Sequence, residues 1–148
     1  MTIEYDPALP QGRALGLQIL HSAEGASRLS VPYREDLVGD PATGVIAGGV
    51  VTTLLDSACG HAVASSLSEP TSIATLDLRI DYMRRAKPGL AVTAEAHVYK
   101  LTRSIAFVRA IAHDGDPADP VAAAQAAFML DSDAGRGVGA NLKPDGKA

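Results

Sequence analysis

The segment from Gly44 to Gly60 constrains this chain most, because it has the composition of an apolar helix that carries a single carboxylate, Asp56. A helix that is hydrophobic on nearly every side is a buried helix, and an Asp is almost never fully buried without a partner. We therefore predict a central helix from about Ala47 to Ser66, with a carboxylate enclosed in the fold.

Two glycines, Gly48 and Gly49, stand at the start of this predicted helix. The first N–H groups of a helix have no partner within it, glycine lets a ligand come close to them, and the helix dipole favours negative charge there. N–H donors and a carboxylate are together the groups needed to attack a carbonyl with water. The alternative is a structural role, in which Asp56 caps a neighbouring element or pairs with an Arg across a subunit interface.

Small side chains flank Asp56 on the predicted helix. At roughly 100° per residue, Gly49, Thr52, Gly60 and Val63 lie within about 40° of it. This stripe leaves room for a bound molecule, so we predict that Gly49, Thr52 and Gly60 contact the substrate. The opposite face should pack against a sheet through Val51, Leu54, Ala58 and Ala62.

Composition and charge narrow the class of protein. A chain of 148 residues with 47% apolar residues fits one folded domain, and a net charge of −4 without a basic stripe gives no reason to expect nucleic-acid binding. The single cysteine, Cys59, cannot form an internal disulfide, the N-terminus lacks the features of a signal peptide, and no apolar run reaches the ~20 residues of a membrane helix. We expect a cytoplasmic protein that is not in a membrane, with a core of Ala, Val, Leu and Ile.

Alternation and turn residues predict strands on both sides of the helix. Leu76, Leu78, Ile80 and Tyr82 recur with a period of two, which predicts that they share one face of a strand. The Ala-rich segment 121–130 would suit a helix by propensity, but Pro120 and the preceding hairpin favour a strand. The predicted strands span 16–21, 25–33, 75–82, 90–100, 104–113 and 121–130. Residues 1–14 form a lead-in, 15–131 a single α+β domain in which an antiparallel sheet wraps one long helix, and 132–148 a disordered tail.

Several segments carry a resemblance to a known family. The pattern Gly48-Gly49-Val50, followed by Leu54-Leu55-Asp56-Ser57, resembles the helix motif of the hotdog-fold acyl-CoA thioesterases, in their PaaI-like branch. The segments 73–83, 105–108 and 122–128 resemble later strands of that branch, so the similarity runs from about Tyr33 to Leu130.

This resemblance implies a hotdog fold, in which chains pair into homodimers with a continuous sheet and often assemble as homotetramers. It also implies hydrolysis of a coenzyme A thioester, a reaction that needs no metal or redox cofactor. Coenzyme A itself is part of the substrate. Asp56 matches the general base or nucleophile, Gly48 the glycine whose N–H polarises the thioester carbonyl, and Thr75 the hydroxyl that positions water. In the family the two halves of the site come from different chains of the dimer.

The chain departs from the family pattern at the start of the helix. Ala47 stands where the family has a His, and Asp40 and Pro41 occupy the region where many relatives have an Asn or Gln. The main alternative is therefore an acyl-CoA-binding hotdog protein that does not hydrolyse its ligand. A hydratase or dehydratase would need a His that this helix start lacks, and a purely structural oligomer would pair Asp56 with an Arg away from any cavity.

The remaining polar residues have less specific interpretations. Arg84, Arg85 and Arg103 could bind the phosphates of coenzyme A or be solvated strand ends. Cys59 is predicted to pack in the core, and His61 to be a buried or interface histidine. His21, His97 and His113 lack the spacing of metal ligands, so we predict no metal site.

Overall fold

The computed structural model describes residues 9–131, and the predicted long helix and six strands occur in the predicted order, together with a short N-terminal helix and a two-stranded ribbon that were not predicted. They are α1 (Pro10–Leu15), β1 (Gln18–Ala23), β2 (Ala26–Val31), a 3-10 turn (Glu35–Leu37), β3 (Val38–Asp40), β4 (Val45–Ile46), α2 (Gly48–Ser66), β5 (Ser72–Tyr82), β6 (Val92–Leu101), β7 (Ile105–His113) and β8 (Ala122–Asp131). The predicted tail, 132–148, lies outside the described residues.

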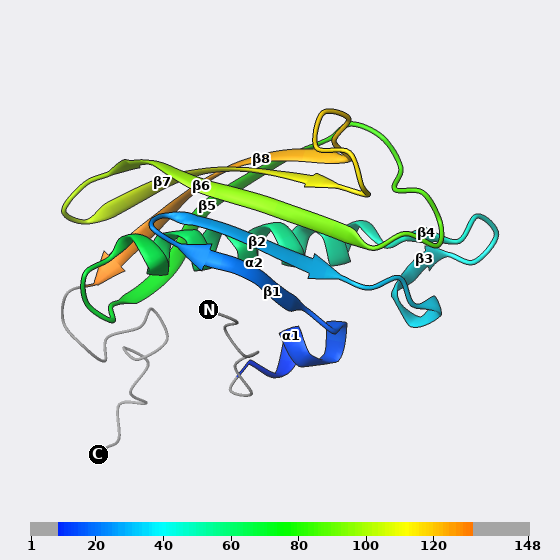
Figure 1. Ribbon diagram of the computed structural model, residues 1–148, viewed down its shortest axis with the longest axis horizontal. Coiled ribbons are helices and arrows are strands. Elements are labelled where there is room, and N and C mark those ends of the chain that lie inside the picture. The colour runs from blue at the N-terminus through cyan, green and yellow to red at the C-terminus, as the bar shows by residue number, and fades with distance from the viewer. Residues whose placement is uncertain (1–8, 132–148) are drawn as a thin grey trace, which may run out of the picture.

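Six strands form one antiparallel sheet in the order β1-β2-β6-β7-β8-β5, and β3 pairs with β4 in a separate ribbon. Figure 1 shows α2 running along one face of this curved sheet. The arrangement confirms the prediction of an antiparallel sheet wrapped around one long helix. It also leaves β5, the longest strand, at one edge of the sheet.

Small residues line the interface between the sheet and α2. The four helix residues predicted to face the sheet are all buried, and the buried sheet positions opposite them are largely alanines. These include Ala94, Ala106, Ala112, Ala122 and Ala124. Alanine lets the helix backbone come close to the sheet, which explains why the Ala-rich segment at the C-terminal end is strand β8 despite its helical propensity.

The lead-in contains a short helix that the sequence analysis missed. α1 begins at Pro10 and is followed by Gly16 in the left-handed conformation (φ 71°), so β1 begins at Gln18 rather than at Gly16. A proline at the first helical position and a glycine just past the last one are a recognised helix signal. That signal was present in the sequence.

A β-bulge divides β5 into two parts. The pairing with β8 shifts between Thr75 and Asp77, which makes Leu76 the extra residue. Leu78 and Ile80 pack against the core, whereas Leu76 is 54% exposed. The prediction that Leu76 shares a face with Leu78 is therefore wrong, because a bulge reverses the alternation of side chains. The reversal turns Thr75 towards α2.

Candidate active site

Asp56 and Thr75 meet between α2 and β5. The Thr75 hydroxyl donates a hydrogen bond of 2.8 Å to Asp56 Oδ1, and within residues 9–131 nothing hydrogen-bonds Oδ2. Thr75 uses its only hydroxyl hydrogen in this bond, so its oxygen can accept a hydrogen bond from water. One carboxylate oxygen is thus fixed and the other is available to a water molecule or a substrate.

Asp56 is more open than the sequence indicated. In the single chain its side chain is half-buried, and Thr75 is exposed. The prediction of an enclosed carboxylate is therefore wrong for one chain. The reason is that Asp56 meets the sheet only at β5, its edge strand, and no further strand within residues 9–131 covers the helix beyond β5.

Gly48 and Gly49 begin α2 and are both exposed. Neither has a positive φ, and a Cβ on Gly49 would have nothing within 4 Å. Neither the backbone nor the packing of this chain therefore requires glycine at position 49, although glycine costs a helix about 0.5–1 kcal/mol relative to alanine. Ala47, at the N-cap, offers no side-chain hydrogen bond to the first turn. The helix start thus presents backbone N–H donors to open space.

The donors and the carboxylate do not meet within one chain. Gly48 and Asp56 are eight residues apart on α2, which corresponds to about 12 Å along the helix axis at 1.5 Å per residue. A single carbonyl group cannot contact both of them.

Thr52 and Tyr82 form a small polar cluster at the start of α2. The Tyr82 hydroxyl donates to the Gly48 carbonyl at 2.9 Å and lies 2.5 Å from Thr52 Oγ1, which is itself 3.1 Å from the same carbonyl. Thr52, predicted to contact substrate, therefore bonds to the helix backbone. Sequence patterns did not single out Tyr82, because its place in the alternation of β5 resembled that of a core residue.

Gly60 lies one turn beyond Asp56 and is half-buried. A Cβ at this position would lie 3.8 Å from Phe128 and 4.0 Å from Ile73, both on the sheet. Gly60 thus belongs to the stripe of Asp56 and also lies close to the sheet.

A cavity of about 170 Å³ lies between α2 and the segment that contains α1 and β1. Its apolar wall comes from α1, β1 and β2, and Thr53, Ser57 and His61 line it from α2. Ser57 follows Asp56 directly in the chain. The cavity therefore begins one residue, or about 100° around the helix, from Asp56, which does not itself line it.

Arg84 is held within the fold. Its two terminal nitrogens donate to both carboxylate oxygens of Asp114, at 2.9 and 2.6 Å, and to the carbonyls of Arg85 and Asp119, while Nε lies 3.2 Å from the Asp119 carboxylate. The Arg84 guanidinium holds the pKa of the Asp114 carboxyl well below its usual range. We therefore assign Arg84 a structural role in place of the predicted phosphate contact.

Arg85 and Arg103 are exposed but lie at opposite ends of β5. Arg85 comes after the Tyr82 end, whereas the hairpin of Arg103 contacts the end of β8 that pairs with Ser72, through a bond from Leu130 N–H to the Ser104 carbonyl. Eleven strand residues at about 3.3 Å each separate these ends by more than 30 Å. One chain does not bring the two arginines to the same phosphate.

Cys59 packs in the core, as predicted, and is fully buried. Burial, and secondarily the charge of Asp56, raise the pKa of the Cys59 thiol to about 12. A thiol in this state is a poor nucleophile. Within residues 9–131, no cluster of three or more His, Cys, Asp or Glu side chains could hold a metal ion, and no helix is long and apolar enough to cross a membrane.

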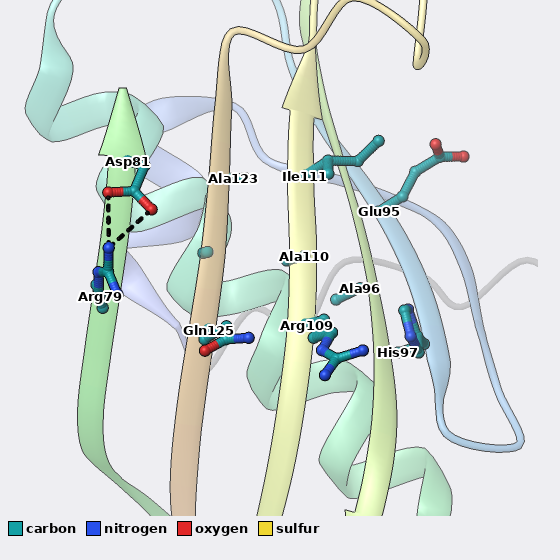
Figure 2. A pocket seen from close by; sticks show the side chains of 11 residues that line it. Arg79, Asp81, Glu95, Ala96, His97, Arg109, Ala110, Ile111, Ala123 and Gln125 are labelled. Atoms are coloured by element: carbon teal, nitrogen blue, oxygen red, sulfur yellow. Dashed lines mark hydrogen bonds and ion pairs between the residues drawn. The ribbon is translucent and has the colours of Figure 1, made fainter. Parts of the chain in front are cut away.

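A larger hollow, of about 610 Å³, lies on the face of the sheet that points away from α2. Figure 2 shows its charged side chains standing above alanines, with Arg79 and Asp81 paired on β5 and Arg109 at the centre. Because the sheet separates this hollow from Asp56 and Thr75, we do not include it in the candidate active site.

Comparison with known proteins indicates the family of this chain. Residues 43–121 match the model of a family described as the thioesterase superfamily. The chain is 29% identical to a medium/long-chain acyl-CoA thioesterase, YigI, of Salmonella typhimurium, over 82% of this chain and 86% of that protein. It is also 39% identical to a protein of Halobacterium salinarum that is provisionally named an esterase, over 54% of this chain, and it spans about half (55%) of that relative.

A solved structure supports the same relationship. A mutant of PaaI, a phenylacetic acid degradation protein of Thermus thermophilus, superposes with a TM-score of 0.70 at 30% identity, over 82% of this chain and 98% of that one. The sheet order and the single long helix of the present chain are those of a hotdog fold, which confirms the predicted fold class.

Proposed function

Because this chain belongs to the thioesterase superfamily, we propose that it hydrolyses the thioester bond of an acyl-CoA. The observation that carries the proposal is the Asp56–Thr75 pair, which leaves one carboxylate oxygen available beside open space. Asp56 acts as general base or nucleophile, Thr75 orients the attacking water, and the Gly48 N–H stabilises the oxyanion. The coenzyme A thiolate then leaves without a strong acid, and the reaction needs no further cofactor.

Each site is proposed to form between two chains. The separation of about 12 Å between Gly48 and Asp56 requires a second copy to supply the missing half. β5 offers the means, because an unpaired edge strand is a template for pairing with another strand. Antiparallel pairing of β5 with its copy about Leu78 would bring Thr75 of one chain level with Asp81 of the partner subunit.

The outer face of the sheet supports the expected pairing of dimers into a tetramer. Its hollow carries charges of both signs, including Arg79, Asp81, Glu95 and Arg109, above small side chains. A surface with both signs can be complementary to itself across a two-fold axis. We propose a second copy as its occupant, and the mass in solution distinguishes dimer from tetramer.

The cavity beside Ser57 is proposed to hold the acyl group. Its volume of about 170 Å³ equals roughly six times the ~30 Å³ that a water molecule occupies, enough for part of an acyl chain. The apolar wall favours an aliphatic chain, as does the relationship to YigI, which is named for medium and long chains. Ile19→Phe, which narrows the cavity, should shift the preferred substrate to shorter chains.

The remaining assignments follow from the shared site. Arg85 of one chain and Arg103 of the partner subunit would lie at the same end of the paired β5 strands, where both could contact coenzyme A phosphates. Gly49, Thr52 and Gly60 lie along the side of α2 where the substrate is proposed to bind, although the Thr52 hydroxyl bonds to the helix backbone. The buried, reduced Cys59 is compatible with the proposed cytoplasmic location.

The first test is a thiol-release assay over short, medium, long and aromatic acyl-CoAs. Wild type should hydrolyse at least one of them, and Asp56→Asn should lose ~10²–10⁴ in kcat, the contribution of a general base. Binding of acyl-CoA without turnover of any substrate would instead establish a non-catalytic binding protein.

A mixing experiment tests the division of the site between chains. Gly48→Pro removes the N–H donor, and proline is tolerated at the first position of a helix. Gly48→Pro and Asp56→Asn should each be inactive, yet random mixing of the two should restore about a quarter of wild-type activity, because half of the dimers are mixed and each holds one intact site. No recovery in confirmed mixed dimers would show that the site does not combine two chains.

A further inference from the structure

The hydroxyl of Tyr82 hydrogen-bonds to the first turn of α2. It reaches the Gly48 carbonyl from the last residue of β5, and with Thr52 Oγ1 it places two hydroxyl oxygens within 3.1 Å of one peptide oxygen. The Tyr82 side chain remains 52% exposed, so burial of its ring does not explain this position. The contact is a specific one between an edge strand and the first turn of the helix.

The first turn needs such a contact because its own sequence leaves it loosely held. Two consecutive glycines have the greatest backbone freedom of any residues, and the N-cap residue, Ala47, provides no side-chain hydrogen bond. The Gly48 carbonyl belongs to the same peptide group as the Gly49 N–H. A hydrogen bond to that carbonyl therefore fixes the plane of this peptide and polarises its N–H.

We propose that Tyr82 is a positioning residue, whose hydroxyl, supported by Thr52, holds the Gly48–Gly49 peptide, so that the Gly49 N–H joins the neighbouring Gly48 N–H in pointing at the substrate carbonyl. The inference rests on the proposed function, since it concerns the donors of that same site. Tyr82 itself does not contact the reacting atoms.

Tyr82→Phe tests the proposal, because it removes the hydroxyl and keeps the ring. Loss of an oxyanion donor costs ~10²–10³ in rate, so loss of the group that positions it should lower kcat about tenfold, with KM within about twofold of wild type. Thr52→Val should lower kcat in the same direction, and Thr52→Ser, which keeps a hydroxyl, should restore it. Tyr99→Phe is the matched control, since Tyr99 is a 43% exposed tyrosine on β6, away from α2.

A second readout separates this proposal from the proposed function. The Gly49 amide should shift in a ¹H–¹⁵N spectrum of Tyr82→Phe and exchange faster with solvent, while Tyr99→Phe leaves it unchanged. If wild type hydrolyses no acyl-CoA, the proposed function fails, and the Gly49 amide still decides whether Tyr82 holds this peptide. An unshifted Gly49 amide, or a kcat of Tyr82→Phe within twofold of wild type in an active enzyme, overturns the positioning role.

Discussion

The two sides of α2 differ in how far the same chain covers them. On the side that faces the sheet, Leu54, Leu55 and Ala58 are fully buried by strands of the same chain. On the other side, Gly49 is exposed and Asp56 is half-buried, although both lie on the same helix. The same chain covers the closed side, whereas it contacts the open side only through β5 and leaves Gly49 and one carboxylate oxygen of Asp56 available to a second chain or a ligand.

This difference separates residues that determine stability from residues that determine activity. Substitutions on the closed side should act on the free energy of unfolding, and substitutions on the open side should act on catalysis. The experiments below test this division.

Leu54→Ala should have the largest effect on stability. It removes a fully buried side chain from the closed side and leaves a cavity, which costs ~2–5 kcal/mol of unfolding free energy. Denaturant unfolding measures the loss. Leu90→Ala, at a leucine that is 42% exposed, should stay within ~0.5 kcal/mol, and an equal loss there would contradict the assignment.

Asp114→Asn should change the acid sensitivity of the fold, because Asp114 is buried and paired with Arg84 within one chain. The pKa of Asp114 is lowered in the folded state, chiefly by its hydrogen bonds to Arg84, so its carboxylate contributes stability above its ordinary pKa of about 3.9 and loses that contribution as the pH falls below it. Wild type should thus lose unfolding free energy below about pH 4, and Asp114→Asn should be less stable at neutral pH with a shallower acid dependence. Identical pH profiles would show that this ion pair does not stabilise the fold.

Gly49→Ala should move stability and activity in opposite directions. The new methyl group meets nothing within 4 Å and improves helix propensity by about 0.5–1 kcal/mol, but it occupies space that we assign to the substrate. Thermal unfolding and kcat/KM should show a more stable and less active protein. Ala64→Gly, the reverse change at an exposed position of α2, should lower stability by a similar amount and leave kcat unchanged.

Cys59 should show the smallest effect, namely no reaction. With its thiol pKa raised to about 12, only ~10⁻⁴ of it is thiolate at pH 8. A disulfide reagent should therefore leave the native protein unmodified and react at once in guanidinium chloride. Rapid reaction of the native protein would show that α2 opens on its sheet side.

Much of the fold was predictable because its signals are local. The apolar helix, the turns around Pro88 and Gly115, and the spacing of the strands each depend on a few neighbouring residues. The roles of Asp56 and Thr75 were predicted from the family resemblance and stay predictions, and the structure places Thr75 against Asp56. α1 was missed although proline and glycine mark its two ends.

The unpredicted features depend on contacts between distant segments. Arg84 looked like a free cation at a strand end, but its ion pair joins it to Asp114, 30 residues away. Tyr82 looked like a core residue, but its hydroxyl meets Gly48, 34 residues earlier. No local pattern encodes such contacts. The half-exposed state of Asp56 was missed for a related reason, because apolar composition alone does not say which chain covers a helix.

The bulge at Leu76 shifts the alternation of side chains along β5 by one residue. Before it, the odd-numbered Ile73 and Thr75 face α2, and after it the even-numbered Leu78, Ile80 and Tyr82 do. Thr75 and Tyr82 both touch α2 because of this shift. An unbroken alternation could present either of them to the helix but not both. Deleting Leu76 would therefore turn either Thr75 or Tyr82 away from α2 without altering a single functional side chain.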